Sequence, residues 1–118
     1  MTLQEIFDKS STHLLTQNAR SLAPSSDFFC AYRGRNELKC AVGVLISDEA
    51  YSHDLEGRGC DALEVEQALE ASGVPTTREA RDLMDALQYI HDYVEPQDWH
   101  EQLRDLAARL GLQFSAGG

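Results

Sequence analysis

The sequence predicts an α+β fold that is mainly α, in which four to five helices carry one small β-hairpin. Two observations indicate this class. Apolar residues recur at three- and four-residue steps in several segments, a spacing typical of amphipathic helices. Residues 28–41 place aromatic and apolar runs on either side of Gly34-Arg35-Asn36, which has turn chemistry. Because 118 residues match the commonest domain size, we expect a single domain over 1–118, folded over 1–114 with a flexible tail at 115–118.

The first helix is expected at the N-terminal end of the chain. Thr2 and Glu5 have the spacing of a capping box, in which each side chain accepts a hydrogen bond from a backbone N–H group of the first turn. Apolar residues that share one face of this helix are Leu3, Ile6, Phe7 and Leu14. Asn18 is suited to the left-handed conformation that ends many helices, so we expect the helix to end near Gln17.

The segment that follows holds two of the three cysteines and the most apolar run of the chain. Residues 28–33 and 38–41 predict the two strands of the hairpin. The run 40–46 is too short for periodicity to distinguish a buried strand from a packed helix. Its small residues Ala41 and Gly43, and the Ser-Asp-Glu helix start after it, favour a helix packed closely against a neighbour.

A second helix is predicted after a polar connection at 48–59. It covers about residues 61–72 and ends at Gly73, a residue type favoured just beyond helix ends. Its apolar residues are Leu63, Val65, Ala68 and Leu69.

Two more helices follow, and they have the clearest periodicity. The first starts from a capping box between Thr76 and Glu79, and its apolar stripe comprises Ala80, Leu83, Met84, Leu87, Ile90, His91 and Val94. Pro96 then suits the first turn of the last helix, and Gly111 its end. The inward stripe of the last helix comprises Trp99, Leu103, Leu106, Ala107 and Leu110.

Charge is distributed unevenly along the chain. The formal net charge is −10, from 20 acidic and 10 basic residues, which disfavours direct binding of nucleic acid through its phosphates. Residues 48–70 carry −7 of this charge, because eight acids face only Arg58 there: Asp48, Glu49, Asp54, Glu56, Asp61, Glu64, Glu66 and Glu70. Just before them, Arg33, Arg35 and Lys39 form a small basic cluster. We therefore expect an electrostatically two-faced molecule.

Composition also predicts the compartment. No segment approaches the roughly 20 apolar residues that span a bilayer, and the N-terminal residues lack the features of a signal peptide. Three cysteines without a Cys-x-x-Cys motif argue against a disulfide framework and against a four-thiolate zinc site. We expect a cytoplasmic protein with reduced thiols, no membrane association and no cofactor.

Several short motifs together resemble one protein family. They are Cys30-x-Tyr32-Arg33, Lys39-Cys40-Ala41-Val42-Gly43-x-Leu45-Ile46, Asp48-Glu49-x-Tyr51, Glu56-Gly57, Leu87-Gln88-x-Ile90-His91-Asp92 and Trp99. The chain is similar in these to a family of small proteins common in phages, prophages and bacterial genomes. The resemblance implies a bacterial cytoplasm and a mobile-element origin. It implies no activity, and the chain departs from the family pattern at Ser47 and at the extra Cys60.

Cysteine and histidine are the best candidates for catalysis. Cys40 at the start of a helix would have its thiolate favoured, His91 would serve as base, and Asp92 or Asp98 would orient the imidazole. Against this, free cysteine is among the most buried residue types, and His91 lies on an apolar stripe. We therefore expect Cys40 and His91 to be core residues, and a small cysteine-dependent enzyme is the second hypothesis.

The remaining thiols admit other chemistry. Cys30 and Cys40 would face each other across the hairpin, where packing, a redox pair and a metal pair all remain open. The residue types that bind zinc are Cys30, Cys40, Cys60, His53, His91 and His100. Their spacing matches no ligand motif, so no metal site is predicted.

The first functional hypothesis is a non-catalytic interaction protein of phage or mobile-element type. Its acidic surface, and the basic turn beside it, would dock to a bacterial host protein with a basic surface. One version is an inhibitor of a host nucleic-acid-handling or defence complex. The predicted partner-binding residues are Glu56, Asp61, Glu64, Glu66, Glu70, Arg33 and Arg35. A third hypothesis is a homodimer that buries the small-residue face around Gly43.

Overall fold

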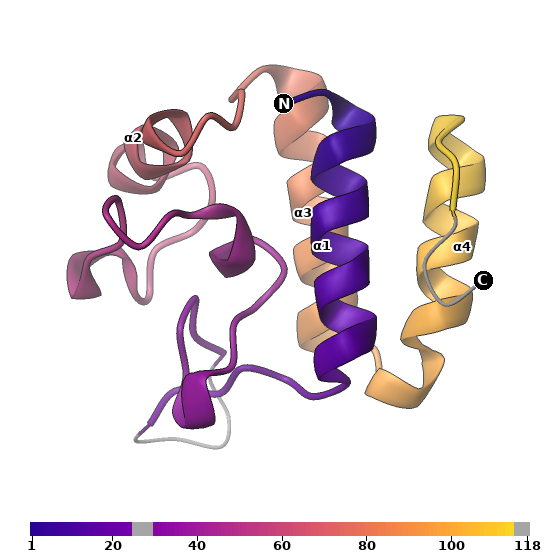
Figure 1. Ribbon diagram of the computed structural model, residues 1–118, viewed down its shortest axis with the longest axis horizontal. Coiled ribbons are helices and arrows are strands. Elements are labelled where there is room, and N and C mark those ends of the chain that lie inside the picture. The colour runs from indigo at the N-terminus through magenta and orange to yellow at the C-terminus, as the bar shows by residue number, and fades with distance from the viewer. Residues whose placement is uncertain (25–29, 115–118) are drawn as a thin grey trace.

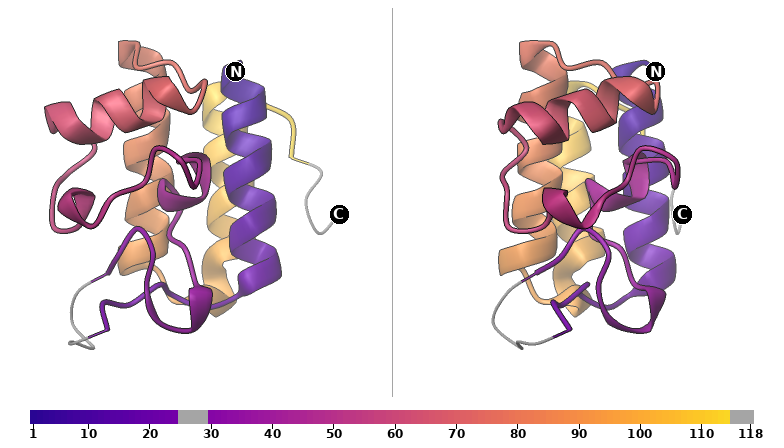
Figure 2. Two further views of the ribbon diagram at one scale, coloured as in Figure 1. Left: turned by 60° about the vertical axis from the view of Figure 1, so that its left-hand side comes forward. Right: turned by 90° about the vertical axis from the view of Figure 1, so that its left-hand side faces the viewer.

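In the computed structural model, which describes residues 1–24 and 30–114, three helices form a bundle: α1 (Leu3–Gln17), α3 (Arg78–Tyr93) and α4 (Trp99–Leu110). They pack side by side (Figure 1). The shorter α2 (Leu63–Ala71) lies across the beginning of α3 (Figure 2). Residues 30–62 cover the side of α1 and α3 that faces away from α4. The mainly helical class is thus confirmed, whereas the predicted tail at 115–118 lies outside the described residues.

Helix α1 begins and ends as its sequence predicts. The Thr2 hydroxyl accepts the backbone N–H of Glu5 at 3.1 Å, and the Glu5 carboxylate accepts the backbone N–H of Thr2 at 2.9 Å. Asn18 adopts a left-handed conformation with φ 50° and donates its N–H to the Leu14 carbonyl at 2.8 Å. The capping box and the C-terminal cap are both confirmed, because each satisfies backbone groups that the helix leaves unpaired.

The core lies between the apolar stripes of the three bundle helices and extends to α2 and to the segment 40–46. Trp99 is completely buried, and its indole N–H donates to the Val94 carbonyl at 2.9 Å. Side chains buried with it include Ile6, Phe7, Leu14, Leu83, Met84, Leu87, Leu103 and Leu106. Each large apolar side chain contributes about 1.5–3 kcal/mol when fully buried. The bundle is therefore the stable frame on which the rest of the chain is held.

Helix α2 is shorter than predicted, and the predicted cap of α3 is displaced by one residue. Residues 59–62 form a turn in which Ala62 donates its N–H to the Gly59 carbonyl at 3.0 Å, so α2 starts only at Leu63. Thr77, not Thr76, caps α3, and its hydroxyl accepts the N–H of Ala80 at 3.3 Å. Thr76 instead donates to the Glu70 carboxylate.

The predicted β-hairpin at 28–41 is wrong for the residues that the structure describes, which exclude 28 and 29. Two isolated antiparallel bridges, Leu22 with Cys30 and Arg33 with Lys39, take its place. Side chains from the end of α1 and from the segment after it bind the backbone groups that a second strand would use. The Gln17 amide oxygen accepts the N–H of Lys39, and the Ser21 hydroxyl donates to the carbonyls of Ala31 and Leu38. A continuous ladder is therefore absent between these segments.

Residues 40–46 pack as tightly as predicted, but they form only a single 3₁₀ turn, η2 (Gly43–Leu45), rather than an α-helix. A Cβ atom on Gly43 would lie 2.1 Å from the Tyr32 carbonyl oxygen. This is too close for any side chain, so only glycine fits at this position. The small-residue face is thus covered by the chain's own backbone. Gly43 itself is therefore buried within the chain, and the homodimer of the third hypothesis stays a prediction.

Candidate functional site

A pocket of about 690 Å³ opens between the C-terminal half of α3 and the segments 30–32 and 56–61. All three cysteines line it, although they are scattered in the sequence. The other lining residues are Ala31, Tyr32, Glu56, Gly57, Arg58, Gly59, Asp61, Asp85, Gln88, Tyr89, Asp92 and Tyr93. The pocket therefore lies where the irregular part of the chain meets α3.

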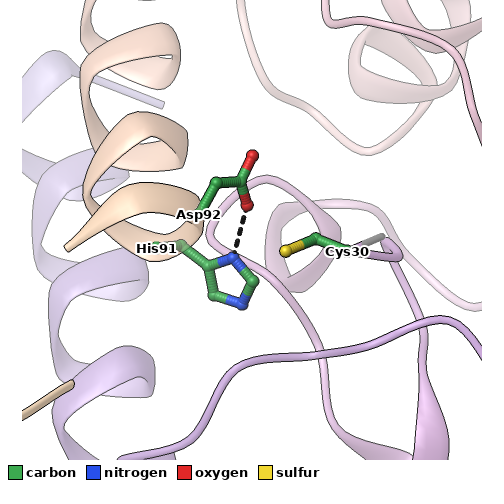
Figure 3. Close-up of side chains that lie close together, drawn as sticks. All are labelled: Cys30, His91 and Asp92. Atoms are coloured by element: carbon green, nitrogen blue, oxygen red, sulfur yellow. Dashed lines mark hydrogen bonds and ion pairs between the residues drawn. The ribbon is translucent and has the colours of Figure 1, made fainter. Parts of the chain in front are cut away.

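His91 and Asp92 of α3 lie beside Cys30 (Figure 3), and of these three residues Cys30 and Asp92 line the pocket. His91 is completely buried and stacks on Trp99, with 5.7 Å between ring centroids. Its Nε2 atom accepts the backbone N–H of Ser21 at 2.9 Å, and its Nδ1 atom lies 2.7 Å from a carboxylate oxygen of Asp92. A backbone N–H can only donate, so Nε2 carries no proton. The proton is therefore on Nδ1, which donates it to Asp92.

This tautomer decides whether the cluster suits a metal ion. The ligand atoms of Cys30, His91 and Asp92 lie within 4.8 Å of one another, which is close enough for a shared ion. A metal on Nδ1 would force the ring proton onto Nε2, where it would face the N–H of Ser21. Two donors would then oppose each other in a buried place, which costs the desolvation energy of an unsatisfied group. The cluster therefore fits a structural hydrogen-bond network better than a metal centre.

The thiols of the pocket are held in their neutral form. Burial and the adjacent Asp92 carboxylate raise the pKa of Cys30 to about 12. Burial raises the pKa of Cys40 to about 12, although the N–H groups of Gly43 and Val42 oppose this. Burial and the charge of Asp85 raise the pKa of Cys60 to about 12. Since the thiolate is the nucleophilic form, none of the three is activated at neutral pH.

The structure places the predicted catalytic residues Cys40, His91 and Asp92 near one pocket but does not join them into a catalytic arrangement. Cys40 is 1% exposed, and its sulfur accepts the N–H of Gly43 at 3.3 Å. Asp92 orients the imidazole, as predicted. Both nitrogen atoms of His91 are occupied by Ser21 and Asp92, so the ring has no lone pair left to take a thiol proton.

Glu56 holds the wall of the pocket opposite α3. Its carboxylate accepts the backbone N–H groups of Tyr32 at 2.9 Å and Arg33 at 3.1 Å, together with the Tyr51 hydroxyl at 2.6 Å. Arg33 is bound within the chain too, by Asp48 at 2.8 Å and by the face of the Tyr51 ring, 4.4 Å from its centroid. These two predicted partner-binding residues therefore organise the fold locally.

The other predicted partner-binding residues lie nearer the surface. On α2, Glu64 and Glu66 form ion pairs with Arg58 at 3.6 Å and with Arg81 at 3.5 Å, respectively. Glu70 is exposed. On the basic turn, Arg35 donates to the Ala23 carbonyl at 3.0 Å. The acids of α2 thus form a surface outside the pocket.

Asp61, like Glu56, is a predicted partner-binding residue that lines the pocket, and it meets there Asp85 of α3, an acid that the sequence did not single out. Burial raises the pKa of the Asp85 carboxyl, and repulsion from Asp82 and Asp61 adds to the effect, against a smaller opposing effect of Arg81. Neither the Asp61 carboxylate nor the Asp85 carboxylate has a hydrogen bond or salt bridge to another residue in the described part of the chain. The pocket therefore presents two carboxylates that no other described side chain binds directly, and Arg58 lies in the same lining.

Sequence reasoning missed Tyr89 and Tyr93, which form the aromatic rim of the pocket. They stand one turn apart on α3, with ring centroids 5.1 Å apart, and are 60% and 74% exposed. The sequence feature that could have identified them is their position outside the apolar stripe of this helix. Two neighbouring tyrosines on an exposed helix face are not explained by core packing.

Comparison with other proteins adds no assignment to this site. Among the described residues, no helix has both the length and the apolar character needed to cross a membrane. No protein-family model, curated protein or solved structure matches this chain.

Proposed function

We propose that this protein is a non-catalytic interaction protein that binds a partner protein with a basic surface. The observation that carries the proposal is the meeting of Asp61 and Asp85 in an open pocket, where Asp82 and Asp61 repel the Asp85 carboxylate more strongly than Arg81 attracts it. Bringing together carboxylates from separate segments costs repulsion energy, which an arriving positive charge would relieve. The acids of α2 extend the same negative field beside it.

The resemblance to phage, prophage and bacterial proteins suggests the partner's origin. A bacterial host protein that handles nucleic acid, or a defence complex, has a basic surface of the kind that this charge would attract. The protein would then act as its inhibitor by occupying that surface. This finer version rests on charge complementarity and on the sequence resemblance.

A small cysteine-dependent enzyme is the weaker alternative. It requires a reactive thiol and a histidine with a free nitrogen. Cys40 is buried with a pKa of about 12, and both nitrogens of His91 are hydrogen-bonded within the chain. These observations favour binding over catalysis.

Charge reversal on the full chain tests the proposal. The variant Asp61→Lys with Asp85→Lys should lose binding to the partner isolated from a host extract. The complex of the wild-type protein with that partner should dissociate as the salt concentration rises. The matched control is Glu101→Lys with Asp105→Lys, two exposed acids of α4 that change the net charge by the same amount. Binding that is insensitive to salt, or lost equally in both variants, would contradict the proposal.

A further inference from the structure

We infer that the pocket receives the guanidinium group of one arginine side chain from the basic partner; the inference rests on the proposed function and deepens it. Five residues of α3 line the pocket, namely Asp85, Gln88, Tyr89, Asp92 and Tyr93. Their spacing places them along one side of the helix. Asp61 faces them from the segment before α2.

The tyrosines offer the flat surfaces that a guanidinium binds. Tyr89 and Tyr93 leave most of their ring area in solvent, and their planes are tilted by 41°. A cation over such a face is attracted by the ring quadrupole, and arginine also stacks on it with its planar group. The chain already uses this contact once, where the guanidinium of Arg33 lies over the Tyr51 ring.

The carboxylates offer the acceptors that the guanidinium N–H groups need. Asp61 and Asp85 are free of hydrogen bonds and salt bridges to the described residues, so their oxygen atoms can accept from a ligand. The arginine in the pocket wall does not meet this need, because Arg58 donates to the Asp54 carbonyl at 2.7 Å and pairs with Glu64. A guanidinium with five N–H groups can use carboxylates on two sides at once.

Shape and chemistry favour arginine over a small cation or lysine. The pocket holds about 690 Å³, far more than a bare ion fills. Among the described residues, the cluster of Cys30, His91 and Asp92 is the one group of possible ligands, and its histidine is in the wrong tautomer for a metal. An ammonium group is a compact point charge that gains less from two flat rings. The arrangement of aromatic rim and flanking carboxylates therefore matches a planar, elongated cation.

The test compares two labelled peptides of equal charge, each with four lysines, that carry either arginine or a fifth lysine at the centre. The full-length protein should bind the arginine peptide about two- to fivefold more tightly, the factor expected of a cation–π contact at an exposed site. Spectra of the ¹⁵N-labelled protein should show shifts at Gly57 and Gly59, whose amides lie in the pocket wall.

Variants of the two rim tyrosines distinguish binding in the pocket from attraction by the net charge of the protein. Tyr89→Leu with Tyr93→Leu should abolish the preference for arginine, whereas Tyr89→Phe with Tyr93→Phe should keep it, because the rings remain. Equal binding of both peptides by the wild type, or a preference that persists in the leucine variant, would overturn the inference while leaving the proposed function intact. If neither peptide binds, the proposed function fails with it.

Discussion

The backbone N–H of Ser21 donates to Nε2 of His91 at 2.9 Å, which joins two buried residues that stand 70 positions apart in the chain. The bond ties the segment after α1 to the C-terminal half of α3, and it fixes the histidine tautomer. Arg20 adds to the same connection, since its side chain donates to the carbonyls of His91 and Val94.

Removal of this acceptor should destabilise the fold. His91→Ala leaves the Ser21 N–H unpaired and opens a cavity beside Trp99, so we expect a loss of about 2–4 kcal/mol in the free energy of unfolding. His91→Gln keeps an oxygen that can accept from Ser21 and should lose less. Urea denaturation measures both, and equal losses in the two variants would show that the hydrogen bond contributes little.

Glu56 should be more important for stability than an exposed acid. Glu56→Gln replaces one carboxylate oxygen by an NH₂ group that cannot accept from Tyr32 or Arg33, so we expect a loss of about 1–3 kcal/mol. Glu70→Gln is the matched control, because its carboxylate is exposed and accepts only the Thr76 hydroxyl among the described residues. Denaturation midpoints that fall equally in both variants would contradict the structural role of Glu56.

Gly43 should not tolerate a methyl group. Gly43→Ala places Cβ against the backbone of Tyr32, which cannot retreat without disturbing the bonds to Glu56, and we expect a loss of at least about 2 kcal/mol. Gly59→Ala is the control, because its Cβ would meet only the end of the Asp61 side chain. A thermal melt in which both variants behave alike would argue against the close contact.

The three thiols should make the protein sensitive to alkali. Their pKa is raised from 9.0 to about 12 in the fold, so the native state retains protons that the unfolded state loses. The resulting stabilisation is fully present below pH 9 and is lost as the pH rises from about 9 through 12. Urea titrations at pH 8 and 10.5 should show this decline, and Cys40→Ala should reduce its slope. A slope unchanged by that substitution would exclude Cys40 as a contributor.

The same thiols should react slowly with alkylating reagents in the native protein. Only the thiolate reacts, and at pH 8 a thiol with a pKa near 12 is almost entirely protonated. Mass spectrometry after iodoacetamide treatment should find little labelling in buffer and complete labelling in denaturant. Rapid labelling of Cys40 in buffer would reopen the enzyme hypothesis.

The sequence predicts the bundle well because its helices depend on local features. The stripe of α3, the capping box at Thr2 and the left-handed Asn18 each act within a few residues of the chain, and all three were confirmed. The hairpin failed because the partners of Lys39 and Leu38 are side chains at Gln17 and Ser21, which periodicity cannot identify. Short segments with two competing sets of partners are decided by tertiary contacts.

The candidate site was less predictable than the fold. Asp61 was found from its charge, but its meeting with Asp85 depends on how residues 56–61 fold against α3. The state of His91 depends on Ser21, far away in sequence. Tyr89 and Tyr93 carry a local mark, an i, i+4 pair off the apolar stripe, and this could have been recognised before the structure.

Helix α3 sets a fixed spacing between the groups that a ligand in the pocket would contact. Asp85 and Tyr93 are eight residues apart, a separation of about 12 Å at the helical rise of 1.5 Å per residue. The opposite side of α3 is locked into the bundle through Leu83, Leu87 and Ile90, so this spacing cannot adjust to a ligand. Selection between partners would then depend on whether a ligand carries its binding groups at the spacing of Asp85 and Tyr93. Any adjustment of the pocket to the ligand would have to come from the opposite wall around Glu56.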